Sequence, residues 1–306
     1  MYKIGQRLAG LCLAVMAMVL MLTACRSAAA EIGGNPVEYP TSDTSQPRQF
    51  QPREAIVPGA RPVPVTAPDI ESVLDNPVTL WQLQPLQVGE ELIIMHTTLG
   101  DVTLRLFPQV APVAVENFRT HAWNGYYDGL IFHRVISNFM IQGGCPDGTG
   151  MAGQDIWGGS FGQEFSYELW HFRGALAMAQ SAMPNSIGSQ FYIVQNAGVS
   201  ADFAADFRWL SEPENAAQIA GTFEDGRVIT YGDVFPADMA QHFLEHGGTP
   251  HLDWPFNAGG HTVFGHVVEG MDVVDAIART PARNDRPVTD VVITHVTFTT
   301  YQGAGN

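Results

Sequence analysis

Basic residues are scarce in this 306-residue sequence, and lysine is almost missing from it. The chain carries 15 lysines and arginines against 31 aspartates and glutamates, which gives a formal net charge of −16 at pH 7. Lys3 is the only lysine, so the rest of the chain offers none for Schiff-base chemistry. The phosphates of nucleic acids and anionic lipid headgroups repel a chain this acidic. We therefore expect no nucleic-acid partner.

The N-terminus has the features of an export signal. Lys3 and Arg7 precede an apolar stretch, residues 8–22, which is too short for a comfortable membrane span but suits a secretory signal. The stretch ends in Leu22-Thr23-Ala24-Cys25. This ending resembles a bacterial lipoprotein signal, in which the cysteine is acylated and becomes the new N-terminus. An ordinary signal peptide or an N-terminal anchor that happens to end in Cys25 is the alternative.

We predict that residues 1–24 are a lipoprotein signal peptide and that Cys25 is the lipidation site. Acyl chains on Cys25 would hold the protein on the extracytoplasmic side of the bacterial cell membrane. Loss of Lys3 and Arg7 with the signal would change the formal net charge from −16 to −18.

Cysteine is also scarce, with three in the whole chain. Cleavage of the signal would leave Cys25 and Cys145, and acylation of Cys25 would leave Cys145 without a disulfide partner. No base lies near Cys145 in the sequence, and this cysteine follows an apolar run that ends in Gly143-Gly144. We therefore expect a buried, inert thiol rather than a nucleophile.

Residues 25–88 have the composition of a tether. Ten of the 20 prolines fall between Pro36 and Pro85, and periodic apolar runs are missing. Such a segment is semi-rigid and partly polyproline II. Its end near Trp81-Gln82-Leu83 has the apolar character of a segment that packs on the domain that follows.

Residues 89–303 are expected to form one mainly β domain. Strand patterns are read at 91–97, 101–107, 131–142, 190–195, 263–267 and 291–299, and helix patterns at 111–118 and 271–279. Many short strands with two helices, and without alternation of strand and helix, favour a closed antiparallel barrel capped by the helices. An acidic insertion is expected at about 197–249.

The stretch FHRVISNFMIQGG, residues 132–144, contains two strand patterns around a turn at Ser137-Asn138. Arg134 lies within the first apolar run, where a charge is costly unless it has a partner or a function. Alternation predicts Phe132, Arg134 and Ile136 on one side of the strand. The alternative to a functional arginine is a structural one, paired with a buried carboxylate.

Metal and cofactor sites are not expected. His242 and His246 have a spacing that can bind zinc, but a helix face that carries two histidines explains the pattern as well. Gly148, Gly150 and Gly153 lie in a glycine-rich stretch that lacks the lysine of a phosphate-binding loop.

Four motifs in this order resemble the cyclophilin-type peptidyl-prolyl isomerases, over about residues 91–300. They are the 132–144 stretch, Gly174-Ala175-Leu176-Ala177-Met178-Ala179, Gly188-Ser189-Gln190-Phe191-Tyr192-Ile193 and His261-Thr262-Val263-Phe264-Gly265. The resemblance implies an eight-stranded closed antiparallel β-barrel with a helix over each end. It also implies proline-containing polypeptides as substrates and no cofactor.

The resemblance assigns roles to individual residues. Arg134 matches the catalytic arginine and Gln142 the glutamine that orients it. The remaining matches are substrate-binding: Phe139 and Met140 in a proline slot, Ala179 and Gln180 as a backbone-binding pair, Gln190 and Tyr192 on one strand face, Leu252 in the slot and His261 at its rim.

Two departures from the family pattern lie near the expected slot. Tyr192 stands where the family usually has phenylalanine, so that a hydroxyl is expected at the slot's rim, and His251 falls where many members carry tryptophan. We expect a lipid-anchored, extracytoplasmic isomerase that assists folding of secreted or cell-envelope proteins. A non-catalytic proline-peptide-binding or chaperone module, or a scaffold, is the alternative.

Overall fold

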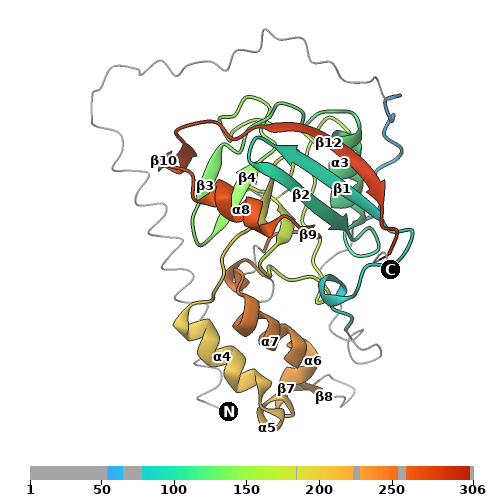
Figure 1. Cartoon of the computed structure of the whole chain (residues 1–306). Coiled ribbons are helices and arrows are strands. Elements are labelled where there is room, and N and C mark those ends of the chain that lie inside the picture. The colour runs from blue at the N-terminus through green and yellow to red at the C-terminus, as the bar shows by residue number, and fades with distance from the viewer. Residues whose placement is uncertain (1–53, 65–77, 184, 223–227, 254–259, 304–306) are drawn as a thin grey trace. The chain divides into compact units, whose positions relative to one another are not determined.

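The computed structural model of the chain describes residues 54–64, 78–183, 185–222, 228–253 and 260–303 (Figure 1). The compact unit that contains the sheet runs from Ala55 to the C-terminus. The predicted signal peptide, Cys25 and residues 26–53 of the predicted tether lie outside the described residues. Among the described helices, none is both long and apolar enough to cross a bilayer.

Eight strands form one antiparallel sheet, and the chain is therefore mainly β, as predicted. In hydrogen-bonding order the strands are β12 (Ile293–Thr300), β1 (Glu91–Thr97), β2 (Gly100–Leu106), β9 (Val263–Glu269), β5 (Ala175–Met178), β6 (Phe191–Val194), β4 (Met140–Gly143) and β3 (Arg134–Ile136). Figure 1 shows β12, β1 and β2 side by side at one end of this order.

The sheet curls into a half-barrel, whereas the predicted closed barrel is not shown. Its order starts at β12 and ends at β3, and no ladder joins these two strands within the described residues. The two edges touch over a short stretch, where Ile131 forms an isolated bridge with Val292 and Phe132 N donates to Val291 O at 3.0 Å. Because β3 has three residues and β12 has eight, most of the edge of β12 that does not pair with β1 has no neighbouring strand.

Two helices, α3 (Pro112–Trp123) and α8 (Met271–Ala278), pack against the sheet at the positions predicted from the sequence. Their buried side chains, among them Phe118 and Ile277, join the main apolar core. Pro112 suits the first turn of α3, where a backbone N–H has no partner within the helix. Helix and strands together thus enclose one core.

Strand alternation separates this core from a second apolar cluster. In β6, Phe191 and Ile193 belong to the main core, whereas Tyr192 and Val194 belong to the second cluster. In β4, Ile141 faces the main core and Met140 the second cluster. The predicted placement of Tyr192 opposite Phe191 is therefore confirmed.

The predicted position of Phe132 differs from the structure, and β2 is buried on both of its faces. Phe132 was expected beside Arg134 but lies in the main core together with Val135, because β3 begins only at Arg134 and the chain before it is irregular. In β2, the face that carries Arg105 is buried as well. The Arg105 guanidinium donates to Glu90 at 2.8 Å and to Gln84 O at 2.6 Å, so that residues before β1 cover this face.

The end of the predicted tether packs on the domain, as expected for 81–83. A short helix, η1 (Trp81–Leu83), buries Gln82, whose side chain exchanges hydrogen bonds with the backbone of Trp170 at 2.9 and 2.7 Å. Trp81 Nε1 donates to Glu168 at 3.1 Å. These contacts fix the segment that leads into β1.

The predicted insertion contains helices and a small hairpin, which Figure 1 shows grouped together. The elements are α4 (Ala201–Ser211), α5 (Pro213–Ala216), β7 (Ile219–Thr222), β8 (Val228–Thr230), α6 (Tyr231–Val234) and α7 (Ala237–His246). Phe207 of α4 stacks on Phe243 of α7 with ring centroids 5.0 Å apart. Phe243 in turn packs against Phe172, which precedes β5. The insertion is thus joined to the sheet by aromatic contacts.

Candidate active site

The 132–144 stretch forms a hairpin that places Arg134 beside Gln142. Arg134 of β3 pairs with Gln142 of β4, and Gln142 pairs with Tyr192 of β6. The turn between β3 and β4 includes Asn138, whose φ of 59° lies in the left-handed region that asparagine tolerates. Because side chains directly opposite on neighbouring strands share a face, Arg134, Gln142 and Tyr192 form one row across the sheet.

Nine of the ten residues predicted for catalysis or substrate binding line one cavity of about 130 Å³. They are Arg134, Phe139, Met140, Gln142, Ala179, Gln180, Tyr192, Leu252 and His261. These residues come from strands and loops that are far apart in the sequence. Leu252 belongs to the short helix η2 (Pro250–Leu252), and its carbonyl accepts from His261 N at 3.1 Å.

The tenth predicted residue, Gln190, lies behind the cavity and holds Gln142. The Gln142 side-chain amide donates to Gln190 Oε1 at 3.0 Å. Gln190 Nε2 donates to the carbonyls of Gly150 and Ala152, at 3.1 and 2.7 Å. A chain of side-chain amides therefore runs from the 150–152 loop to the row that contains Arg134.

Arg134 stands at the rim of the cavity with 43% of its side chain exposed. Its Nη1 lies 3.5 Å from Gln142 Oε1, and its Nε lies 3.6 Å from Asp285 Oδ2. Asp285 is 51% exposed and belongs to the turn between β10 (Ala282–Arg283) and β11 (Arg286–Pro287). A structural arginine would need a buried carboxylate as its partner, but the partner of Arg134 is the exposed carboxylate of Asp285. The guanidinium is accessible to a ligand in the cavity.

Part of the cavity lining is apolar, and both His261 in the lining and His251, which stacks on Phe139, are neutral near pH 7. Phe139, Met140 and Leu252 join the second apolar cluster, and Phe139 stacks on His251 with ring centroids 5.7 Å apart. Burial, together with the nearby His171, lowers the pKa of His261 to about 4. Burial likewise lowers the pKa of His251 to about 4. Arg134 is therefore the charged side chain of the cavity lining.

The Tyr192 hydroxyl is buried rather than at the rim, which corrects the expectation from the sequence. Tyr192 is 4% exposed, and its hydroxyl lies 2.8 Å from His171 Nε2. His171 Nδ1 lies 2.5 Å from Asp253 Oδ1. In the neutral tautomer of His171 with its proton on Nδ1, Nε2 accepts from the Tyr192 hydroxyl. Burial raises the pKa of Tyr192 well above 10, so the hydroxyl keeps its proton.

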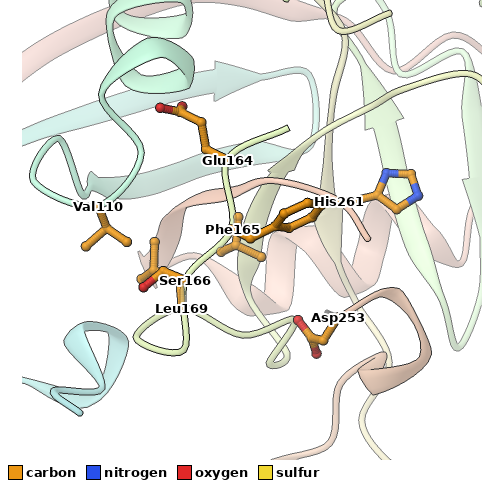
Figure 2. Close-up of a pocket in the computed structure, with 8 residues that line it drawn as sticks. Val110, Glu164, Phe165, Ser166, Leu169, Asp253 and His261 are labelled. Atoms are coloured by element: carbon orange, nitrogen blue, oxygen red, sulfur yellow. The ribbon is translucent and has the colours of Figure 1, made fainter. Parts of the chain in front are cut away.

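A second, smaller cavity adjoins the first through His261. Figure 2 shows the side chains that line it, with Glu164 and Asp253 on separate segments. Glu164 accepts hydrogen bonds from Val113 N and Ala114 N at 3.2 and 2.9 Å, and so caps the N-terminus of α3. This buried carboxylate therefore has a structural function.

The remaining sequence candidates lie elsewhere. His242 and His246 are on α7 as predicted, with ring centroids 4.5 Å apart. Across the described residues, no group of three or more histidine, cysteine, aspartate or glutamate side chains could hold a metal ion. Cys145 is buried, as predicted, and its Sγ donates to Asp147 Oδ1 at 3.0 Å.

Three residues of the site could not be identified from the sequence. Asp285 lies beside Arg134, His171 contacts Tyr192, and Asp253 contacts His171. The pair Asn284-Asp285 is typical of a tight turn, and both residues have positive φ, but a turn pattern does not predict which arginine lies beside it. His171 and Asp253 carried no recognisable signal.

Comparisons with known proteins agree with this geometry. Residues 92–298 match the family model of the cyclophilin type peptidyl-prolyl cis-trans isomerases. A protein of Staphylococcus haemolyticus (strain JCSC1435), named for peptidyl-prolyl cis-trans isomerisation, is 45% identical over 209 residues, which are 68% of this chain and 91% of that protein. A protein of the same name from Staphylococcus aureus (strain USA300) is 45% identical over 210 residues, again 68% and 91%.

Among solved structures, a cyclophilin type isomerase of Cryptosporidium parvum aligns with a TM-score of 0.49 and 24% identity, over 69% of this chain and 98% of that one. The family assignment depends on the sequence matches, which cover two thirds of the chain. This chain is a cyclophilin-type peptidyl-prolyl cis-trans isomerase.

Proposed function

We propose that this isomerase assists the folding of secreted or cell-envelope proteins, and that Arg134 is its catalytic donor beside an apolar proline slot. The observation that supports the proposed mechanism is the single cavity in which a half-exposed guanidinium faces Phe139, Met140 and Leu252. An apolar wall can hold the proline ring by burial alone, and the guanidinium provides a donor at its edge.

The chemistry needs no nucleophile and no proton transfer. Rotation about an X-Pro bond has a barrier of about 20 kcal/mol, because the planar amide is stabilised by resonance. When the C–N bond twists, the prolyl nitrogen becomes pyramidal and its lone pair becomes a hydrogen-bond acceptor. A fixed guanidinium therefore stabilises the twisted amide more than the planar one, and this difference lowers the barrier.

In this proposal the other polar side chains position the reacting groups. Gln142 orients Arg134, and Gln190 holds Gln142 in turn. Ala179 and Gln180 bind the substrate backbone, and His261, neutral because of its lowered pKa, lies at the rim. A positive charge on His261 would compete with Arg134 for the same electron-rich atoms, so the neutral form suits this mechanism.

Replacement of Arg134 tests the proposal directly. We expect Arg134→Ala to reduce kcat/KM by roughly two to three powers of ten, the range for removal of one preorganised donor. Arg134→Lys should recover only part of this loss, because an ammonium keeps the charge but lacks the planar fork that can engage Gln142 and the substrate together. The rates are measured on a short X-Pro peptide and on a protein whose refolding is limited by proline isomerisation.

A control variant and a stability measurement separate catalysis from structure. Arg283→Ala removes another exposed arginine, on β10, and should leave the rate unchanged. Thermal unfolding of Arg134→Ala should stay close to that of the parent chain, since the Arg134 and Asp285 side chains are both about half exposed. A variant that melts much lower but keeps its rate would show that Arg134 is structural. Retained peptide binding with an unchanged rate in Arg134→Ala would mean that another group stabilises the twisted amide.

We further propose that Cys25 carries the lipid anchor and that the domain works on the extracytoplasmic side of the membrane. The support is the sequence alone: the basic residues Lys3 and Arg7, the apolar stretch and the residues before Cys25 form a lipoprotein-like signal. A tether rich in proline would let the domain reach substrates at a distance from the membrane.

A further inference from the structure

A segment of the predicted tether lies against the isomerase domain. Residues 55–64 belong to the same compact unit as the sheet. Asn124, which follows α3, binds the backbone of Ile56 on both sides: its Oδ1 accepts from Ile56 N at 2.8 Å and its Nδ2 donates to Ile56 O at 2.9 Å. A side-chain amide that pairs with both backbone groups of one residue holds that residue as a neighbouring strand would.

Arg61 makes the strongest contact of this segment. Its Nη2 donates to Asp155 Oδ2 at 2.5 Å, and its Nη1 donates to Ser160 O at 3.2 Å. The Asp155 side chain is fully buried, whereas that of Arg61 is 38% exposed. A buried carboxylate needs a charged or strongly donating partner, so this ion pair differs from a surface pair that contributes little.

Trp157 also contacts the segment. Its Nε1 donates to Gly59 O at 2.9 Å, and the Arg61 guanidinium lies over its ring, 4.9 Å from the centroid. Backbone hydrogen bonds, an ion pair and a cation–π contact therefore act on one stretch of six residues, from Ile56 to Arg61. Such a combination is specific to this segment rather than to any extended chain.

Asp155 and Trp157, which contact the segment, belong to the loop that supports the active site. Asp155 Oδ1 accepts from Trp157 N at 3.0 Å and from Gly159 N at 2.8 Å, so the same carboxylate folds the loop and binds Arg61. A few residues earlier, the carbonyls of Gly150 and Ala152 hold the Gln190 side chain. Gln190 holds Gln142, which lies beside Arg134.

We propose that residues 56–61 act as an intramolecular ligand of the isomerase domain, and that Arg61 is a positioning residue for catalysis. By fixing Asp155 and the 150–160 loop, the docked segment keeps Gln190 and Gln142 in the arrangement that orients Arg134. The segment that links the domain to its N-terminus is then part of the catalytic unit. This inference rests on the role proposed for Arg134.

The test uses the full chain with four variants. Arg61→Ala removes the ion pair, Arg61→Lys keeps the charge but not the second donor to Ser160, and Arg208→Ala removes an exposed arginine on α4 as a control. Trp157→Phe, which keeps the ring under Arg61 but not the donor to Gly59, is a milder second variant in case Arg61→Ala folds poorly. Amide hydrogen exchange and isomerisation kinetics are measured on each.

We expect Arg61→Ala to speed exchange at the Trp157 and Gly159 amides by about tenfold or more, since a hydrogen bond to a charged group is lost from the loop. We expect kcat to fall roughly threefold to tenfold with little change in KM, because Arg134 is misplaced while the apolar wall is untouched. Arg61→Lys should restore part of both effects, Trp157→Phe should show smaller effects in the same direction, and Arg208→Ala should show neither.

Two results would overturn the proposal. If exchange at Trp157 and Gly159 is unchanged in Arg61→Ala, the segment does not fix the loop. If exchange is faster but kcat is unchanged, the contact stabilises the loop without positioning Arg134. In both cases a large loss in Arg134→Ala, measured in the same assay, would leave the proposed function of Arg134 standing.

Discussion

The hydroxyl of Tyr192 connects the wall of the proline slot to a buried polar pair. It donates to His171, which donates to Asp253, and all three side chains are nearly or fully buried. The backbone N of His171 also donates to Asp253 Oδ1 at 2.9 Å. Leu252, the residue before Asp253, lines the slot. The network therefore fixes two sides of the slot at once.

Removal of this hydroxyl should be costly although phenylalanine is the usual residue of the family. In Tyr192→Phe, His171 Nε2 would remain buried without its partner, so we expect the free energy of unfolding to fall by about 1–3 kcal/mol. The rate of isomerisation should change less, since the ring that lines the slot remains. Urea unfolding measures the first effect and the peptide assay the second.

Tyr301→Phe is the matched control for this prediction, since Tyr301 is a partly exposed tyrosine at the end of β12. It should unfold like the parent chain. Equal stability of Tyr192→Phe and the parent would mean that His171 does not need the hydroxyl, and the network would then have no influence on the slot.

Sequence reasoning reached the residues near the motifs and missed their distant partners. Strand alternation and the family resemblance together gave Arg134, Gln142, Phe139 and Met140, because all four lie within one hairpin. His171 and Asp253 are 82 positions apart, and only the fold brings them together. Phe132 was misplaced because periodicity cannot show where a regular strand begins.

At the scale of elements, the insertion packs against Phe172 and His171, and His171 holds the Tyr192 hydroxyl. Phe243 of α7 packs edge-to-face on Phe172, with ring centroids 4.7 Å apart, and Thr249 N donates to His171 O at 2.8 Å. Both Phe172 and Phe243 are fully buried. Removal of the insertion would therefore uncover Phe172.

A single substitution in α7 should affect both stability and activity. In Phe243→Ala, we expect the free energy of unfolding to fall by about 3–5 kcal/mol, the usual cost of such a core truncation. We also expect kcat/KM to fall severalfold, since the loss of packing on Phe172 loosens the neighbouring His171. Chemical denaturation and the peptide assay measure the two effects.

Phe203→Ala provides the comparison for this element. Phe203 is also buried but packs on Phe207 within the insertion, with ring centroids 5.8 Å apart. It should lower stability and leave kcat/KM close to that of the parent chain. If both variants keep full activity, the insertion does not support the slot.

The sequence predicted the positions of the strands and helices better than it predicted whether the sheet closes into a barrel. The strands at 91–97 and 293–300 and the helices at 112–123 and 271–278 lie where periodicity placed them. The half-barrel could not be foreseen in the same way, because closure depends on the lengths of two edge strands that are 150 residues or more apart. The insertion was read as an acidic segment, since its small aromatic core depends on contacts between α4 and α7.

At the scale of the whole molecule, the lipidation proposed for Cys25 would decide where the domain resides. Cys25→Ser should prevent this acylation, because the thiol is the proposed acceptor for the lipid, and should leave the protein unprocessed or released. Fractionation of cells followed by mass analysis of the N-terminus measures this. If Cys25→Ser remains with membranes as a processed form of unchanged size, another feature anchors the chain.

Acid should destabilise the folded domain over a defined pH range. Folding lowers the pKa of six of the ten histidines, chiefly by burial: His121, His133, His242, His251, His261 and His266. Between the ordinary value of about 6.5 and the folded values, about 4 for most of them, the unfolded chain binds protons that the folded chain does not. The free energy of unfolding should therefore fall as the pH is lowered from about 6.5 toward 4.

His133→Phe tests the contribution of one group to this slope. His133 is 7% exposed, and burial together with the charges of Arg286 and Arg134 lowers its pKa to about 4. A phenyl ring of similar shape binds no proton. We therefore expect the slope of the free energy of unfolding against pH, between pH 6 and 4.5, to decrease in the variant by an amount that corresponds to at most about one proton. Denaturant unfolding at several pH values gives the slope, and His246→Gln, at an exposed position on α7, is the control. An unchanged slope in His133→Phe would mean that His133 is protonated in the folded chain, and acid unfolding would then have to begin at other groups.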